Sequence, residues 1–119
     1  MVEVMRRCME ISDTALEGLD QCVEVAATGD VKQTYVIFEE MIKGIMAVNE
    51  AMELVRKETE IEEFDDFVIR LEDAIEQMVD LYEQNSPGLT LKCLKQRVLP
   101  SFAAWKGYME SVLKNKVLN

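Results

Sequence analysis

The stretch from Ile61 to Tyr82, IEEFDDFVIRLEDAIEQMVDLY, decides the fold class of this 119-residue chain. Its apolar residues follow one another at alternating spacings of three and four positions, which places them on one face of an α-helix. The residues on this face are Ile61, Phe64, Val68, Leu71, Ile75, Met78 and Tyr82. Acidic residues occupy many of the other positions, so the stretch predicts an amphipathic helix with one buried face.

Two earlier segments have the same spacing, and a further helical segment follows. The stripe of the first segment is Met5, Cys8, Ser12, Ala15, Leu19, Cys22 and Ala26. We expect helices over residues 2–27, 31–57, 60–84 and 90–115. No strand pattern competes with them, and the short connections make consecutive helices antiparallel neighbours. The sequence therefore predicts an all-α protein with a single domain over residues 1–119, folded as a four-helix up-down-up-down antiparallel bundle.

Glycine, proline and capping residues mark the expected helix ends. Gly29 suits the left-handed residue that ends a helix, and Asp30 suits the N-cap of the next helix. Thr59 and Glu62 match a capping box at the start of the third helix. Pro100 lies inside the fourth helix, where its ring clashes with the preceding turn, so we expect that helix to be kinked or split there.

The chain lacks most of the residues from which active sites are built. It has no histidine and no glycine-rich loop of the kind that binds phosphate. Cys8, Cys22 and Cys93 lack both the spacing of a zinc site and a histidine to activate them, so we expect reduced, buried thiols. We predict that the protein is not an enzyme, has no catalytic residues, and needs no metal and no cofactor.

The charge of the chain is strongly acidic and uneven. The formal net charge is -10; residues 1–85 contain 7 Lys/Arg against 22 Asp/Glu, whereas residues 86–119 contain 6 against a single Glu. Such a charge disfavours nucleic acid and anionic membranes as partners. The longest apolar runs are too short to span a bilayer, and the first residues lack the apolar core of a secretory signal. We therefore expect a cytoplasmic protein.

The segment over residues 31–57 carries more apolar surface than one helix–helix contact needs. Two neighbouring stripes form an arc of about 160°, so this helix should contact two partners, either within the fold or partly in another chain. The first stripe is Val31, Tyr35, Phe38, Ile42, Ile45, Asn49 and Met52, and the second is Thr34, Ile37, Met41, Gly44, Val48, Ala51 and Val55. On the fourth helix, Trp105 and Tyr108 are candidate aromatic anchors, although Trp105 also suits a core. The candidate partner-binding residues are Ile37, Met41, Val48, Val55, Trp105 and Tyr108.

Two polar residues fall on core stripes and have two interpretations each. Asn49 lies in the middle of the stripe of the second helix. It suits a hydrogen-bonded core asparagine that sets the helix register, or one wall of a polar pocket inside the bundle. Ser12, on the first helix, poses the same choice in a weaker form.

The overall plan resembles the small acidic all-helical chaperones of bacterial flagellar export. The similarity lies in size, acidity, two long helices joined at Ala27-Thr28-Gly29-Asp30, and a separable last helix after Pro87-Gly88. In that family a helical surface holds an export substrate, and a terminal helix can cover or vacate the site. The resemblance implies that residues 91–118, hinged at Pro87-Gly88 and Pro100, form a movable cover. It assigns no specific binding residue.

We expect a non-enzymatic adaptor or chaperone-like protein that binds an amphipathic helix of a partner protein along its second helix. One alternative is a self-associating structural protein, because the extra apolar face would also serve a two-fold homodimer. A third and weaker alternative is a small-ligand binder with a pocket around Asn49 and Ser12.

Overall fold

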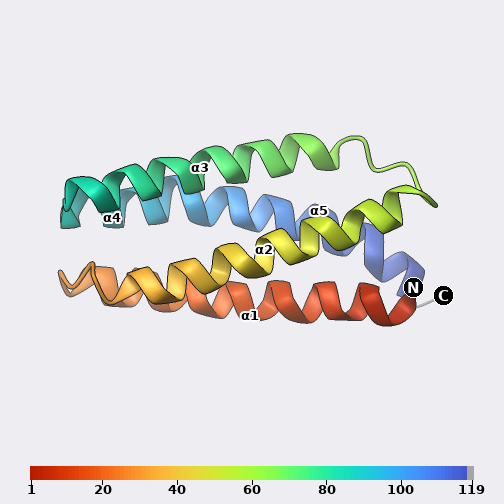
Figure 1. Cartoon of the computed structure of the whole chain (residues 1–119), viewed down its shortest axis with the longest axis horizontal. Coiled ribbons are helices and arrows are strands. Elements are labelled where there is room, and N and C mark those ends of the chain that lie inside the picture. The colour runs from red at the N-terminus through yellow and green to blue at the C-terminus, as the bar shows by residue number, and fades with distance from the viewer. Residues whose placement is uncertain (118–119) are drawn as a thin grey trace.

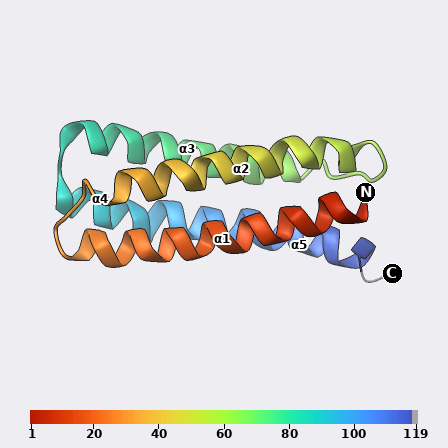
Figure 2. The same cartoon turned by 60° about the horizontal axis from the view of Figure 1, so that its bottom comes forward.

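The computed structural model describes residues 1–117 and confirms the all-α fold (Figure 1). Its elements are α1 (Val2–Ala27), α2 (Thr34–Arg56), α3 (Phe64–Gln84), α4 (Pro87–Cys93), the π-helical turn η1 (Leu94–Val98) and α5 (Leu99–Val117). Because α4, η1 and α5 follow one another without a break, they form one long fourth helix. Figure 2 shows the resulting bundle of antiparallel helices, with the start of α1 and the end of α5 at the same end.

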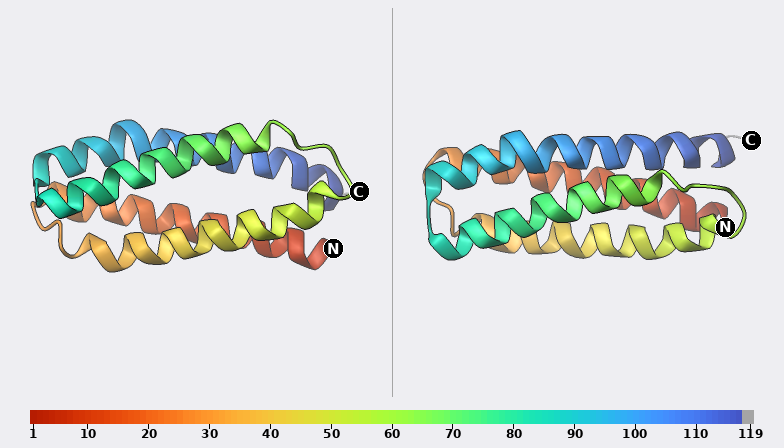
Figure 3. Two further views of the ribbon diagram at one scale, coloured as in Figure 1. Left: turned by 45° about the horizontal axis from the view of Figure 1, so that its top comes forward. Right: turned by 90° about the horizontal axis from the view of Figure 1, so that it is seen from above.

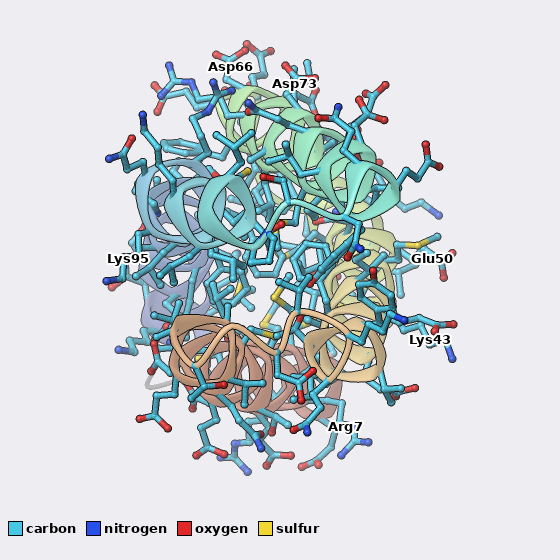
Figure 4. All side chains as sticks on the ribbon, turned by 90° about the vertical axis from the view of Figure 1, so that its left-hand side faces the viewer. Arg7, Lys43, Glu50, Asp66, Asp73 and Lys95 are labelled. Carbon is cyan, nitrogen blue, oxygen red and sulfur yellow. The ribbon has the colours of Figure 1, made fainter. Side chains whose placement is uncertain are left out.

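The core lies where the apolar stripes of the helices meet along the bundle axis. Every member of the predicted stripe of α1, from Met5 to Ala26, is buried. The largest fully buried side chains are Trp105, Phe38, Phe64 and Phe102. Figure 4 looks down the bundle and shows side chains filling the space between the four helices, with labelled charged residues such as Asp73 and Lys95 projecting outward. The spacing of apolar residues in the sequence therefore identified the buried face of α1 correctly, whereas Val68 and Ile75 on the predicted face of α3 remain partly exposed.

The second helix begins later than the predicted residue 31. Residues 31–33 form a tighter turn, in which the Thr34 N–H donates to the Val31 carbonyl at 3.0 Å. Asp30 accepts a hydrogen bond from the Gln33 N–H at 3.4 Å, so it closes this turn rather than capping α2. Buried Val31 anchors the turn to the rest of the protein. Gly29, with φ +91, adopts the predicted left-handed conformation.

The third helix also begins later than predicted, at Phe64 instead of residue 60. The Phe64 N–H donates to the Ile61 carbonyl at 3.0 Å, so residues 61–63 again form a tight turn on a buried apolar residue. The predicted capping box is wrong, because α3 has no side-chain cap and Thr59 lies before the turn. At its other end, α3 stops at Asn85, whose φ of 53 is left-handed.

The fourth helix starts at Pro87, earlier than the predicted residue 90, because proline fits the first helical turn, where no N–H donor is needed. Pro100 interrupts its regularity as predicted. It has no N–H to donate to the carbonyl of Gln96, and the wider turn η1 directly precedes it. Leu118, the last residue of the segment that the resemblance makes a movable cover, lies outside the described residues.

The four helices do not pack equally closely. α1 packs closely against both α2 and α5, and α3 packs closely against α4, η1 and α5. Among the described residues, α2 makes no comparably close approach to α3 or α5. Figure 3 shows the two close pairs, α1 with α2 and α3 with α5, running side by side along the bundle. The two flanks of α2 therefore differ, and the candidate binding surfaces lie along them.

Candidate protein-binding site

A groove with a volume of about 520 Å³ runs along the outer face of the α1–α2 pair. We call it the α1–α2 groove. It is lined by Arg7, Glu10, Ile11, Thr14, Ala15, Gly18, Val36, Ile37, Glu40, Met41 and Gly44. The lining of α1 runs from Arg7 to Gly18, a length of about 16 Å, which is enough for three apolar side chains at i, i+4 and i+7 of a docked helix.

Two glycines explain why α1 and α2 approach closely here. A Cβ added to Gly44 would lie 3.1 Å from Cγ2 of Ile11, and one added to Gly18 would lie 3.4 Å from Cγ2 of Ile37. The two contacts pair a glycine of each helix with an isoleucine of the other. Larger residues at either glycine would push the helices apart, whereas glycine leaves the outer surface hollow between them.

The groove combines an apolar floor with a charged rim. On the rim, Arg7 pairs with Glu10 at 3.7 Å within α1, and Lys43 pairs with Glu40 at 3.3 Å within α2. Val36 is 69% exposed, more than any other large apolar side chain within residues 1–117. An exposed apolar surface beside charged residues is typical of a surface that contacts another molecule.

The structure separates the six predicted partner-binding residues. Ile37 and Met41 line the α1–α2 groove, although Met41 is largely covered. Val48 and Val55 are fully buried in the core, where they stabilise the bundle instead of forming an open surface.

Trp105 and Tyr108 lie away from the groove. Trp105 is fully buried, and half-buried Tyr108 stacks on Phe67 with ring centroids 4.9 Å apart. Val36 was missed by the sequence analysis because it falls outside both stripes of its helix. The signal that could have found it is a valine at an otherwise polar position.

Asn49 and Ser12 both have hydrogen-bond partners inside the protein. Nε1 of Trp105 donates to Oδ1 of Asn49 at 2.9 Å, which links α5 to α2 across the bundle. The Ser12 hydroxyl donates to the Met9 carbonyl of its own helix at 2.8 Å. Asn49 is therefore a hydrogen-bonded asparagine at the edge of the core, which is the first of its two interpretations.

Large side chains bridge α2 and α3 at the end of the bundle near α4. The ring centroid of Tyr82 lies 4.5 Å from that of Tyr35 and 5.6 Å from that of Phe38. The Tyr82 hydroxyl also lies 2.7 Å from Oγ1 of Thr34. Since Thr34 donates its own hydrogen to the Val31 carbonyl, Tyr82 is the donor of this bond. Burial raises the pKa of Tyr82 to about 12.

At the opposite end of the same flank, an ion pair takes the place of the aromatic bridge. The Arg56 guanidinium contacts Asp65 of α3 at 2.5 Å and Glu53 of its own helix at 3.2 Å. Between the two bridges, no glycine contact, hydrogen bond or ion pair joins α2 to α3 among the described residues.

The cysteines are buried and unpaired with one another, as predicted. Burial raises the pKa of Cys22 to about 11, and it also raises the pKa of Cys8 and of Cys93. The thiols are therefore protonated near neutral pH and are poor nucleophiles. Within residues 1–117, no three metal-ligating side chains are grouped to hold an ion. None of the helices described is long and apolar enough to cross a membrane.

Comparison with known proteins places the chain in a family. Residues 3–108 match the family model described as Domain of unknown function (DUF8042), so the chain belongs to that family. No curated protein and no solved structure matches the chain.

Proposed function

We propose that this member of the family is a non-enzymatic adaptor or chaperone-like protein, and that its α1–α2 groove binds an amphipathic helix of a partner protein. The observation that carries the proposal is an apolar floor, open to solvent and about 16 Å long, beside a valine that is 69% exposed. Apolar surfaces with polar rims are typical of protein-binding sites.

The dimensions of the groove support a helix as its ligand. The α1–α2 pair presents two ridges side by side, and a third helix laid between them buries one apolar stripe against Ile11, Val36 and Ile37. Each charge on the rim is already paired with a residue of its own helix, so the rim does not attract a partner of one particular charge. A partner that brought an unpaired charge into the groove would be disfavoured.

A crosslinking experiment tests the proposal. A photo-crosslinking amino acid at position 36 should capture a partner in the source cell, and the same amino acid at position 89 on α4 is the control, because Leu89 is also half exposed. A peptide that covers the crosslinked segment should then bind the purified protein. Val36→Glu should weaken that binding by about tenfold or more, whereas Leu89→Glu should leave it unchanged.

The results that would reject the proposal are equally specific. If the two positions capture the same proteins, or if the peptide binds the Val36→Glu variant as tightly as the parent chain, the groove is not the binding site.

A two-fold homodimer through the same groove is the second candidate, because its apolar floor and the exposed Val36 would also suit a second copy of the chain. Sedimentation equilibrium across a concentration series separates the two. A dimer that Val36→Glu converts to a monomer favours self-association, and a monomer at all concentrations leaves the groove to another protein.

A further inference from the structure

We infer that the face between α2 and α3, which we call the α2–α3 face, is a second docking surface, and that its ligand is a cationic amphipathic helix. It shares no lining residue with the α1–α2 groove, so it adds a binding activity beyond the proposed function. Figure 1 looks onto this face, with α3 above, α2 below and the fourth helix visible behind them.

The apolar part of this face follows from the helix register. Tyr35 lies against Tyr82. Ile42 follows Tyr35 by seven residues and Ile75 precedes Tyr82 by seven, so in these antiparallel helices the two isoleucines lie level with each other. Ile42, Val68 and Ile75 pack against the core on one side and remain partly exposed. Met46 and Val79 extend the apolar surface outward and are 57% and 40% exposed.

The spacing between the helices keeps this surface open. α2 and α3 do not approach closely, so their half-buried side chains are not closed over by the opposite helix. The aromatic bridge of Tyr82 and the ion pair of Arg56 with Asp65 hold the two helices at the ends of the face. Between those ends the apolar surface runs along both helices, as a docked helix requires.

The charge around the apolar surface determines which helix would bind. The exposed carboxylates on and beside the face are Glu39, Glu50, Glu53, Asp65, Glu72, Glu76 and Glu83. The cations there, Lys43 and Arg56, are each already paired with carboxylates. A ligand that carries lysine or arginine beside its apolar stripe gains attraction along the whole face, whereas an acidic helix is repelled.

A second copy of the chain fits this face poorly. The basic part of the molecule is the fourth helix, with Lys92, Lys95 and Arg97 on its surface. Among the side chains described there, Leu89 is the one large apolar side chain that is exposed, so the basic surface lacks an apolar stripe to bury. Two α2–α3 faces would repel each other because both are acidic.

Peptide binding tests the inference directly. The probe is a synthetic peptide of about 18 residues, roughly 27 Å as a helix, with leucines on one face and lysines on the other. The controls are a scrambled peptide of the same composition and a peptide with glutamate in place of lysine. By fluorescence anisotropy, the lysine peptide should bind at least about tenfold more tightly than the scrambled one, and the glutamate peptide should not bind.

Variants assign the binding to the face. The double variant Met46→Ser with Val79→Ser changes two exposed side chains, so it should keep the fold. Its affinity for the lysine peptide should fall by about tenfold. Val36→Ser, on the opposite flank of α2, should change the affinity by less than about twofold. Circular dichroism checks that all three proteins remain helical.

The inference is overturned if the scrambled peptide binds as tightly as the amphipathic one, or if the double variant binds it unchanged. It is also overturned if the parent chain self-associates and the double variant does not, because the occupant is then a second copy. If Val36→Ser weakened peptide binding as much as the double variant, the peptide would bind in the α1–α2 groove. The proposed function would then stand, and the inference about the α2–α3 face would not.

Discussion

The two flanks of α2 are packed in opposite ways. On the α1 side, Gly18 and Gly44 allow the helix axes to approach, and each glycine faces an isoleucine of the other helix. On the α3 side, Tyr35, Tyr82 and Arg56 fill a wider gap. Small residues thus give a close pair with a hollow outer surface, and large residues give a separated pair with half-buried apolar side chains. One helix therefore borders two open surfaces of different chemistry.

The largest effect on stability is expected from a substitution that disrupts the close contact between α1 and α2. Gly44→Leu should destabilise the protein by about 3 kcal/mol, because its Cβ alone would already meet Ile11 at 3.1 Å. Gly107→Leu is the matched control, since nothing lies within 4 Å of a Cβ there, and it should be neutral or stabilising. Urea unfolding measures both. Equal stability of the two variants would show that the α1–α2 contact is not close.

The link between α2 and α5 should have the next largest effect. Trp105→Phe removes the indole N–H that donates to Asn49 and should cost about 2 kcal/mol, from the lost bond and the lost ring volume. A double-mutant cycle with Asn49→Leu separates these two contributions. If the hydrogen bond sets the position of α2, the cycle gives a coupling of about 1 kcal/mol. Additive effects would mean that the bond contributes nothing to stability.

Tyr82 allows the α3 side to be tested through pH. Its pKa rises from 10.0 to about 12 on folding, so the fold favours the neutral phenol. That contribution is complete below pH 10 and is lost as the pH rises from 10 to 12. Cys22, with a pKa raised from 9.0 to about 11, adds a loss that begins at lower pH.

Tyr82→Phe should therefore flatten the upper part of this alkaline loss and should cost about 1 kcal/mol at neutral pH, where the bond to Thr34 is missing. Thermal unfolding between pH 7 and pH 12 compares the two proteins. Parallel curves over the whole range would show that Tyr82 ionises as freely in the folded chain as in the unfolded one.

The smallest effect is expected at the exposed end of the α3 side. Arg56→Gln breaks the ion pairs with Glu53 and Asp65, whose side chains are each 61% exposed, and should cost about 0.5 kcal/mol. The loss should shrink at high salt because the pairs are screened. Unfolding at low and high salt measures it. A cost that is large and independent of salt would mean that Arg56 acts by packing its aliphatic stem.

Much of this architecture was predictable because burial in helices follows a short-range pattern. The bounds of α1 agree with the predicted residues 2–27, and its buried stripe was named correctly. The starts of α2 and α3 were not predictable. In the tight turns before them an N–H donates to the carbonyl three residues earlier, and in an α-helix it donates to the carbonyl four residues earlier, so the two differ by only one position. The capping box at Thr59 failed for the same reason.

The candidate site was only partly predictable. Ile37 and Met41 line the α1–α2 groove, yet Val48 and Val55, on the same stripe, are in the core. Periodicity assigns residues to a face of a helix, but a wide face contacts two neighbours, and the spacing to each neighbour sets what stays exposed. Tyr108 likewise lies beside Phe67, a contact that no local pattern indicates.

The sequence alone determined the helical class, the buried stripe of α1, the glycine turn after α1 and the interruption at Pro100, because each depends on side chains within one or two helical turns. Only the tertiary structure decided that glycines on α1 and α2 meet isoleucines of the opposite helix, and that Asn49 of α2 meets Trp105 of α5. Those contacts join residues far apart in the chain, so the distances between helices, and with them the open surfaces, arise from packing.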